Sequence, residues 1–256
     1  MGALVAAVGS VGADVVAEPK RLFGLGSLNV AAVSNDKRHL ATAGESAAYL
    51  WDFETGTVRH RLPDHGVLVH TLAFSPDSSR LVTGARFGSV AIWSVETGAL
   101  LSMFQAHAGN VDAISFSADG SRFATASSDN TAAVWSLETG ELLGRVKVQG
   151  SPMYAVVFAP GGEHIVTAYT APTNNVRIWD VKSGATVRIL GQHSGDVLSL
   201  AFLSDGTLAT GGTDRKVRLW NPSTGEMLRS LDAARGPVNH LVPIPGTWPG
   251  PSVISL

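Results

Sequence analysis

The chain has 256 residues, of which 45% are hydrophobic and 16% are charged, and its formal net charge is −2. Its Lys and Arg side chains are scattered, which argues against a nucleic-acid partner, because such binding requires clustered basic residues. The absence of cysteine excludes disulfides and cysteine-ligated metal sites. No apolar run approaches the roughly 18 residues of a membrane-spanning helix, so no membrane partner is expected.

Residues 1–17 are apolar and could be mistaken for a secretion signal. They lack the basic N-terminal region of such a signal, and their alternation of Gly and Val suits β-strands equally well. The pattern leaves open whether this segment forms strands or targets the protein. A cysteine-free composition fits a reducing compartment, so we expect a cytoplasmic protein, with a nuclear location left open.

Tryptophan recurs along the chain at spacings of 42, 42, 44 and 41 residues. The positions are Trp51, Trp93, Trp135, Trp179 and Trp220. A glycine stands five residues after each of them, at Gly56, Gly98, Gly140, Gly184 and Gly225. A period near 42 residues with a Trp at the end of a strand indicates a repeat array rather than a fold with a single core.

The repeat is clearest in residues 197–225. Two alternating apolar runs, LSLAF and LATGG, flank a Ser-Asp-Gly turn, and a second turn at Thr213 and Asp214 leads into KVRLW. This pattern predicts three strands joined by tight hairpins, with the repeat glycine in a turn that needs positive φ. We therefore expect a single all-β domain over residues 1–256. Its units are predicted at about residues 29–61, 69–104, 111–146, 153–190 and 197–231, with an incomplete sixth unit from residues 1–24 and 238–256.

These units resemble the blades of WD-repeat β-propellers from residue 20 to the end of the chain. The Trp-Asp dipeptide of that family stands at Trp51 and Asp52, and again at Trp179 and Asp180. The resemblance implies blades of four antiparallel strands in a ring. It also implies that the N-terminal strands complete the sixth blade. The alternatives are a fragment of a seven-bladed ring and a regulatory module of a larger protein.

In the WD-repeat family, a His, a Ser or Thr, an Asp and the Trp form a buried polar network within a blade. Two units match this set: the third has His107, Thr125, Asp129 and Trp135, and the fifth has His193, Thr210, Asp214 and Trp220. The second unit keeps His65, Thr83 and Trp93 but has Phe87 where the Asp belongs, and the fourth has Gln149 in place of the His. Because a buried network stabilises only when every member is paired, we expect the third and fifth units to be the most rigid.

A His, Thr and Asp together could also act as a base, a nucleophile and an orienting group. The set occurs in two units with a Trp donor attached, however, which favours a structural role. The histidines show no metal-binding spacing, and no P-loop or nucleophile elbow is present. The sequence therefore predicts no catalytic residue, no metal site and no cofactor.

The resemblance also implies where a partner would bind. In the family, peptides or proteins bind at the rim of the narrow end of the central channel. The matching positions here are Leu68, His70, Arg86, Asn110, Asp112, Tyr154, Asp196, Leu198 and Asn239. An inserted loop at residues 171–175 is expected on the same side. An aromatic anchor among polar groups suits a protein-binding hot spot.

The function implied is a non-catalytic scaffold, a monomer or a subunit of a larger complex, that binds a protein or peptide. An alternative is a propeller enzyme whose channel site would contain His70, Asp112 and Asp196.

Overall fold

The computed structural model describes residues 28–44, 47–62, 66–170, 176–191, 193–232, 236–243 and 253–255. The N-terminal segment predicted to complete a sixth blade, the predicted network residue His65 and the inserted residues 171–175 lie outside these ranges. Within them the chain consists of strands and one 3₁₀ turn, η1 (Arg86–Gly88), and it contains no helix long and apolar enough to cross a membrane. The all-β prediction is therefore confirmed.

Five sheets contain four strands each, paired antiparallel in chain order. The first has β1 (Leu28–Val33), β2 (His39–Gly44), β3 (Ala48–Asp52) and β4 (Val58–Leu62), and the second has β5 (Val69–Phe74), β6 (Arg80–Ala85), β7 (Ser89–Ser94) and β8 (Leu100–Gln105). The third has β9 (Val111–Phe116), β10 (Arg122–Ser127), β11 (Thr131–Ser136) and β12 (Leu142–Lys147). The fourth has β13 (Met153–Phe158), β14 (His164–Tyr169), β15 (Val176–Asp180) and β16 (Thr186–Leu190), and the fifth has β17 (Val197–Phe202), β18 (Leu208–Gly212), β19 (Lys216–Trp220) and β20 (Met227–Asp232).

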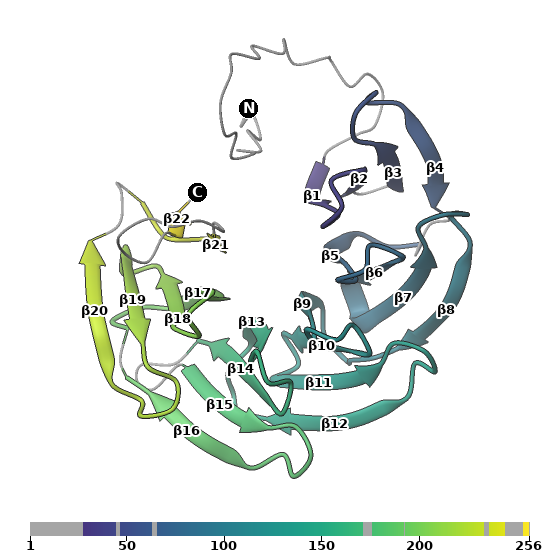
Figure 1. The fold of residues 1–256 in the computed structure, drawn as a ribbon. Helices are drawn as coiled ribbons and strands as arrows, with labels where there is room; N and C mark the ends of the chain where they lie inside the picture. Colours follow the sequence, from purple (N-terminus) through teal and green to yellow (C-terminus); the bar gives the residue numbers. More distant parts are fainter. Residues whose placement is uncertain are drawn as a thin grey trace, which may run out of the picture.

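The five sheets lie side by side in a curved array (Figure 1). The first strand of each sheet lies on the inner side of the curve and the fourth strand on the outer side. Neighbouring sheets contact each other through their inner strands, from β1 against β5 to β13 against β17. This is the arrangement of blades in a β-propeller, so the predicted architecture of five four-stranded blades is confirmed. The sheets are called blades one to five below.

The middle strands of the blades are buried on both faces. In β6, β10 and β14, every residue after the first is buried. Successive side chains of a strand point to opposite faces, so this pattern requires a neighbouring layer on each side. The layer is the next blade: one apolar cluster joins Leu62 of blade one to Leu81 and Trp93 of blade two. The sequences of these strands are therefore nearly continuous runs of apolar and small residues.

The repeat glycine forms the turn between the third and fourth strands of each blade. Its φ is 66°, 68°, 71°, 68° and 79° in blades one to five. Four of these glycines also face a side chain on the outer strand of the preceding blade. A Cβ atom on Gly98 would lie 2.6 Å from Cγ of His60, and one on Gly225 would lie 2.7 Å from Cδ of Arg188. The glycine thus serves both the turn conformation and the close approach of two blades.

A further sheet follows blade five. β21 (Leu241–Pro243) pairs antiparallel with β22 (Val253–Ser255), and β21 contacts β17 and β18. Both strands lie within the segment that the sequence assigns to the sixth unit. How the ring closes stays a prediction.

Replacing Gly98 with Ala should reduce stability more than replacing Gly56 with Ala. Both positions have positive φ, but among the residues that the structure describes only Gly98 has a neighbouring side chain, that of His60, against the added methyl group. We expect Gly56→Ala to lower the free energy of unfolding by about 1 kcal/mol, because of the left-handed conformation alone. Gly98→Ala should lower it by about 2–3 kcal/mol through the added steric conflict. Urea denaturation measures both, and equal losses would show that contact between blades does not require the glycine.

Candidate functional site

A hydrogen bond between a buried Trp and a buried Thr recurs in every blade. The indole Nε1–H of a third-strand Trp donates to Oγ1 of a second-strand Thr over 2.8–2.9 Å. The pairs are Trp51 with Thr42, Trp93 with Thr83, Trp135 with Thr125, Trp179 with Thr167, and Trp220 with Thr210. A buried N–H without a partner is costly, so this bond lets each blade bury a large aromatic side chain.

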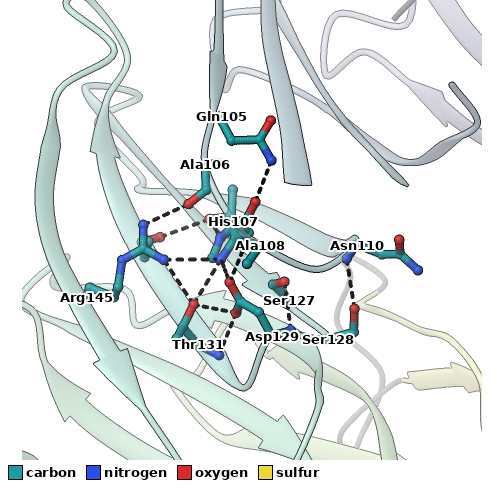
Figure 2. Close-up of polar contacts among 12 residues, drawn as sticks. Gln105, Ala106, His107, Ala108, Asn110, Ser127, Ser128, Asp129, Thr131 and Arg145 are labelled. Carbon is teal, nitrogen blue, oxygen red and sulfur yellow. Dashed lines mark hydrogen bonds and ion pairs between the residues drawn. The ribbon is translucent and has the colours of Figure 1, made fainter. Parts of the chain in front are cut away.

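In blade three this bond belongs to a larger network (Figure 2). Nε2 of His107 lies 2.7 Å from Oγ1 of Thr125, and Nδ1 lies 3.1 Å from Oδ2 of Asp129. The Asp129 carboxylate also accepts hydrogen bonds from the Ala108 N–H at 3.0 Å and the Thr131 hydroxyl at 2.6 Å. The network therefore joins the loop before β9 to the turn between β10 and β11.

The protonation of His107 follows from its surroundings. Burial lowers the pKa of His107 to about 4, and the charge of Arg145 adds to this effect while the Asp129 carboxylate opposes it. A neutral imidazole that donates from Nδ1 to Asp129 accepts at Nε2 from Thr125, whose oxygen accepts from Trp135. Thr125 is fully buried, so a substrate has no access to its hydroxyl. This geometry supports a structural role for the set.

Blade five repeats the arrangement. His193 lies 2.7 Å from Oγ1 of Thr210 and 3.0 Å from Oδ1 of Asp214. Arg218 donates to Oδ2 of Asp214 over 2.7 Å. Burial alone would raise the pKa of Asp214, but hydrogen bonds from Arg218 and His193 lower it to about 2. The carboxylate is thus ionised and held by both neighbours.

Sequence reasoning missed the two arginines of these networks because they come from different strands. Arg145 lies on β12 and donates to Thr131 over 3.0 Å, whereas Arg218 lies on β19. Arg145 pairs across the sheet with Ala133 of β11, and Arg218 occupies the position in β19 that corresponds to Ala133. The two guanidinium groups therefore reach the same region from neighbouring strands, and comparison of equivalent repeat positions does not align them.

Blade four lacks this His–Asp pair. Gln149 stands at the position of the His and is exposed. Arg177 instead lies over the rings of Tyr169 and Trp179, 5.6 Å from each centroid. Sequence reasoning also passed over the buried Thr167 of this blade, although a Thr stands 9 to 12 residues before the Trp in every repeat.

The inner strand of each blade contains a β-bulge at the same place. The pairing register with the second strand skips one residue in β1, β5, β9, β13 and β17. The skipped residues are Asn29, His70, Asp112, Tyr154 and Leu198. A bulge redirects a side chain and often adjoins a functional site. The last four are candidate binding residues from the sequence, which did not reveal that each stands in a bulge.

The other candidate residues lie beside these bulges. In blades two to five a backbone N–H of the turn after the second strand donates to a carbonyl of the loop before the inner strand, over 2.9–3.2 Å, and three of these bonds involve candidate residues. The pairs are Arg86 with Leu68, Ser128 with Asn110, and Thr213 with Asp196. Asn239 is exposed in the loop before β21. The candidates therefore gather at one end of the blades, and their role in binding stays a prediction.

Two bulge residues have polar atoms without a partner. Nε2 of His70 and Oδ2 of Asp112 are buried and make no hydrogen bond within the described part of the chain. Burial raises the pKa of Asp112 to about 6, and the nearby Asp129 carboxylate adds to the shift. Burial also lowers the pKa of His70, helped by the charge of Arg86. Such unpaired atoms are rare in folded proteins.

Phe87 has the largest exposed fraction, 62%, among the large apolar side chains of the described residues. Its φ is 60°, a conformation that bulky residues rarely adopt. Its N–H donates to Oδ1 of Asn110 over 3.3 Å, and the Gln105 side chain donates to its carbonyl. The Arg86 guanidinium lies over its ring at 5.4 Å. The turn thus holds an aromatic ring in solvent, whereas the sequence identified Phe87 only as a substitute for the network Asp.

Within the ranges that the structure describes, no group of three or more His, Asp or Glu side chains could hold a metal ion.

The blades and their Trp-centred networks define a repeat protein of the β-propeller class. A family model described as "WD domain, G-beta repeat" matches residues 56–94, 98–136 and 184–221. The chain therefore contains WD repeats, and WD-repeat proteins generally act as protein-interaction scaffolds. Each matched segment begins at a turn glycine and ends just after the Trp of the next blade.

Two curated relatives match shorter parts of the chain. It is 47% identical over 51 residues to the WD repeat-containing protein pop1 of Schizosaccharomyces pombe, a match that covers 20% of this chain and 6% of that protein. It is 32% identical over 74 residues to the uncharacterized WD repeat-containing protein sll1491 of Synechocystis, with 28% of this chain and 21% of that protein covered. The match thus spans only a small part of either relative.

Removing one member of the blade-five network should destabilise the fold. His193→Ala removes one buried hydrogen-bond partner from Thr210 and one from Asp214, and Asp214→Ala removes the carboxylate to which Arg218 and His193 donate. We expect each variant to lose about 2–4 kcal/mol of unfolding free energy. Gln149→Ala, at the corresponding exposed position of blade four, is the control and should change it by less than about 0.5 kcal/mol. Full stability of both network variants in urea denaturation would show that the network does not stabilise the blade.

Acid should destabilise the fold through His107. Its pKa of about 4 in the folded protein lies below the ordinary value of 6.5, so between these values the unfolded chain binds the proton more readily. The contribution of neutral His107 to the free energy of unfolding is therefore fully present above pH 6.5. It is lost as the pH falls toward 4, by about 2–3 kcal/mol for a pKa shift of this size.

The comparison variant is His107→Gln, which removes the titrating group and places at this position the residue found in blade four. Asp112 titrates with the opposite effect, since its raised pKa favours the folded state as the pH falls. The measurement is therefore the difference in unfolding free energy between wild type and variant from pH 7 to pH 4. We expect this difference to shrink, and a constant difference would contradict the burial of His107.

Proposed function

We propose that this chain is a non-catalytic scaffold that binds a protein or peptide at one end of its blades. The binding surface, called the rim, consists of the bulge residues Asn29, His70, Asp112, Tyr154 and Leu198 with the adjoining turn residue Phe87. The observation that carries the proposal is the recurrence of the bulge in all five inner strands, which presents five chemically different side chains from equivalent positions. A shared backbone with varied side chains suits recognition of a specific partner.

The rim also has the composition of a binding hot spot. Phe87 and Tyr154 are exposed aromatic side chains, at 62% and 38%. Aromatic anchors surrounded by polar groups contribute most of the binding energy in protein interfaces. The hydrogen bonds to the Phe87 backbone hold one anchor before binding, which reduces the entropic cost of association. The partner would thus meet a preformed surface.

The catalytic alternative has one supporting observation, the pKa of Asp112 at about 6, which suits general acid–base chemistry. The rim side chains at the bulges include no Ser, Thr or Lys that could act as a nucleophile beside it. Hydrolase activity that disappears in Asp112→Ala would favour this alternative. We therefore propose binding as the function, by a monomer or a subunit of a larger complex inside the cell.

The test is affinity capture from a lysate of the source cell with three baits. One bait is the wild type, and the second carries Phe87→Ser and Tyr154→Ala, both at exposed side chains that can change without loss of the core. The third carries Leu228→Ser on the outer strand β20, where the side chain is 53% exposed. We expect a protein that the wild type and Leu228→Ser capture equally and that the rim variant captures at least roughly tenfold less, as loss of two anchors implies.

Circular dichroism and thermal unfolding of the three baits establish that each is folded. Equal capture by all three would place the binding surface elsewhere. Loss in Leu228→Ser alone would move it to the outer strands.

A further inference from the structure

A separate pocket lies between blades four and five, at the end of the blades opposite the rim. Its volume is about 270 Å³, which is near the lower end for small-molecule sites. It is bounded by the first residue of β14 and by the turns that precede β14 and β20. The turns beside the rim instead follow the last residues of the second strands, such as β18, and so lie at the opposite end of the blades. The side chains that matter are Pro160, His164, Ile178, Arg188, Phe202 and Pro222.

The walls of this pocket are largely apolar. Ile178 belongs to the apolar cluster between the two blades, and Phe202 packs against it. Pro160 and Pro222 stand in the two turns that frame the opening. Such walls favour a ligand with an apolar body rather than a fully hydrated ion.

Arg188 provides the polar end of the pocket. Its Nη1 donates to the Thr224 carbonyl of the neighbouring blade over 2.8 Å, which fixes the guanidinium across the interface. Its Nε is buried and makes no hydrogen bond with any described residue. Arg188 takes part in none of the ion pairs found in the described part of the chain. The remaining Nε–H therefore requires an acceptor, and a carboxylate matches the guanidinium edge best.

His164 adds a second nitrogen donor to the lining. It pairs across the sheet with Asp180, whose carboxylate accepts hydrogen bonds from the Ser183 N–H at 2.7 Å and hydroxyl at 2.6 Å. Both bonds go to Oδ1, so one oxygen of the neighbouring acid is held by its own turn. A bulge in β16 explains why both Val187 and Arg188 line the pocket, since successive residues of a regular strand point to opposite faces.

Other blades do not place an arginine in such a pocket. The residue that corresponds to Arg188 is His60 in blade one, Ser102 in blade two and Gly144 in blade three. A Cβ atom at Gly144 would lie 2.6 Å from the Val181 carbonyl, so a side chain has no room there. Arg229 of blade five holds the corresponding position but is exposed. The geometry points to a binding site for a small apolar carboxylic acid between blades four and five, with Arg188 as the group that binds the carboxylate.

The test uses sodium 3-phenylpropionate as the probe and its neutral amide as the control ligand. Titration is followed by nuclear magnetic resonance of the Arg188 Nε–Hε signal in the full chain. We expect a saturable shift with a dissociation constant in the millimolar range, as a ligand of this size allows. The amide should bind at least roughly tenfold more weakly because it lacks the charge that pairs with Arg188.

Three variants make the result specific. Arg188→Gln removes the guanidinium. Val187→Glu places a competing carboxylate in the pocket at an exposed residue, so this variant should keep its fold even if Arg188→Gln unfolds. Both should abolish saturable binding, observed through the amide signals of Phe202 and Gly206. Arg229→Gln is the matched control and should bind as the wild type does. The rim variant Phe87→Ser should also bind normally, because the two sites are independent.

Three outcomes would overturn the assignment. The first is the absence of a saturable shift of the Arg188 signal with phenylpropionate, and the second is equal binding of phenylpropionate and its amide. The third comes from a parallel titration with a Leu-Glu-Leu peptide whose two ends are blocked. If this peptide binds through Arg188 and phenylpropionate does not, the pocket receives an acidic segment of a partner protein rather than a small acid.

Discussion

The hydrogen bond from a buried Trp to a buried Thr is the interaction on which each blade depends. Blades two to four pack against a neighbouring blade on both faces, so a large side chain at the end of the third strand loses nearly all contact with water. Trp fills that volume but brings an N–H that needs an acceptor. The Thr of the adjacent strand supplies this acceptor within the same blade. The indole N–H is therefore paired without any contribution from a neighbouring blade. This explains why the bond is present even where the His and Asp are not.

The fold could be predicted from the sequence because its signals are local and repeated. The spacing of Trp and Gly identifies the blade, and each turn glycine has the positive φ that its position indicated. The candidate site could be predicted only in part. Repeat position led to His70 and Tyr154, but the bulges depend on strand register, which a single strand does not reveal. The prominence of Phe87 was also hidden, because its exposure results from a turn held by Gln105 and Asn110 of another segment.

A second set of bulges shapes the outside of the molecule. The register between the third and fourth strands skips one residue next to each repeat Trp. In blades two to five the skipped residues are apolar and about half exposed: Leu101, Leu143, Val187 and Leu228. The same irregularity therefore presents side chains of varied chemistry on the inner strands at one end and, in blades two to five, aliphatic side chains on the outer strands at the other. In blade four it also gives the pocket its paired Val187 and Arg188.

If the rim binds the partner as proposed, blades two and three divide recognition and stability between them. Blade three keeps the complete network, in which His107 stays neutral and Asp129 is bonded on both oxygens. Blade two has a phenylalanine at the position of the Asp, and the turn there adopts positive φ at both Phe87 and Gly88. Such backbone costs free energy and persists only where its surroundings impose it. Here blade three imposes it: Gly88 accepts hydrogen bonds from Ala106 and His107, so the loop ordered by one blade's network holds the exposed aromatic ring of the other. These hydrogen bonds thus connect the network of blade three to the shape of the rim.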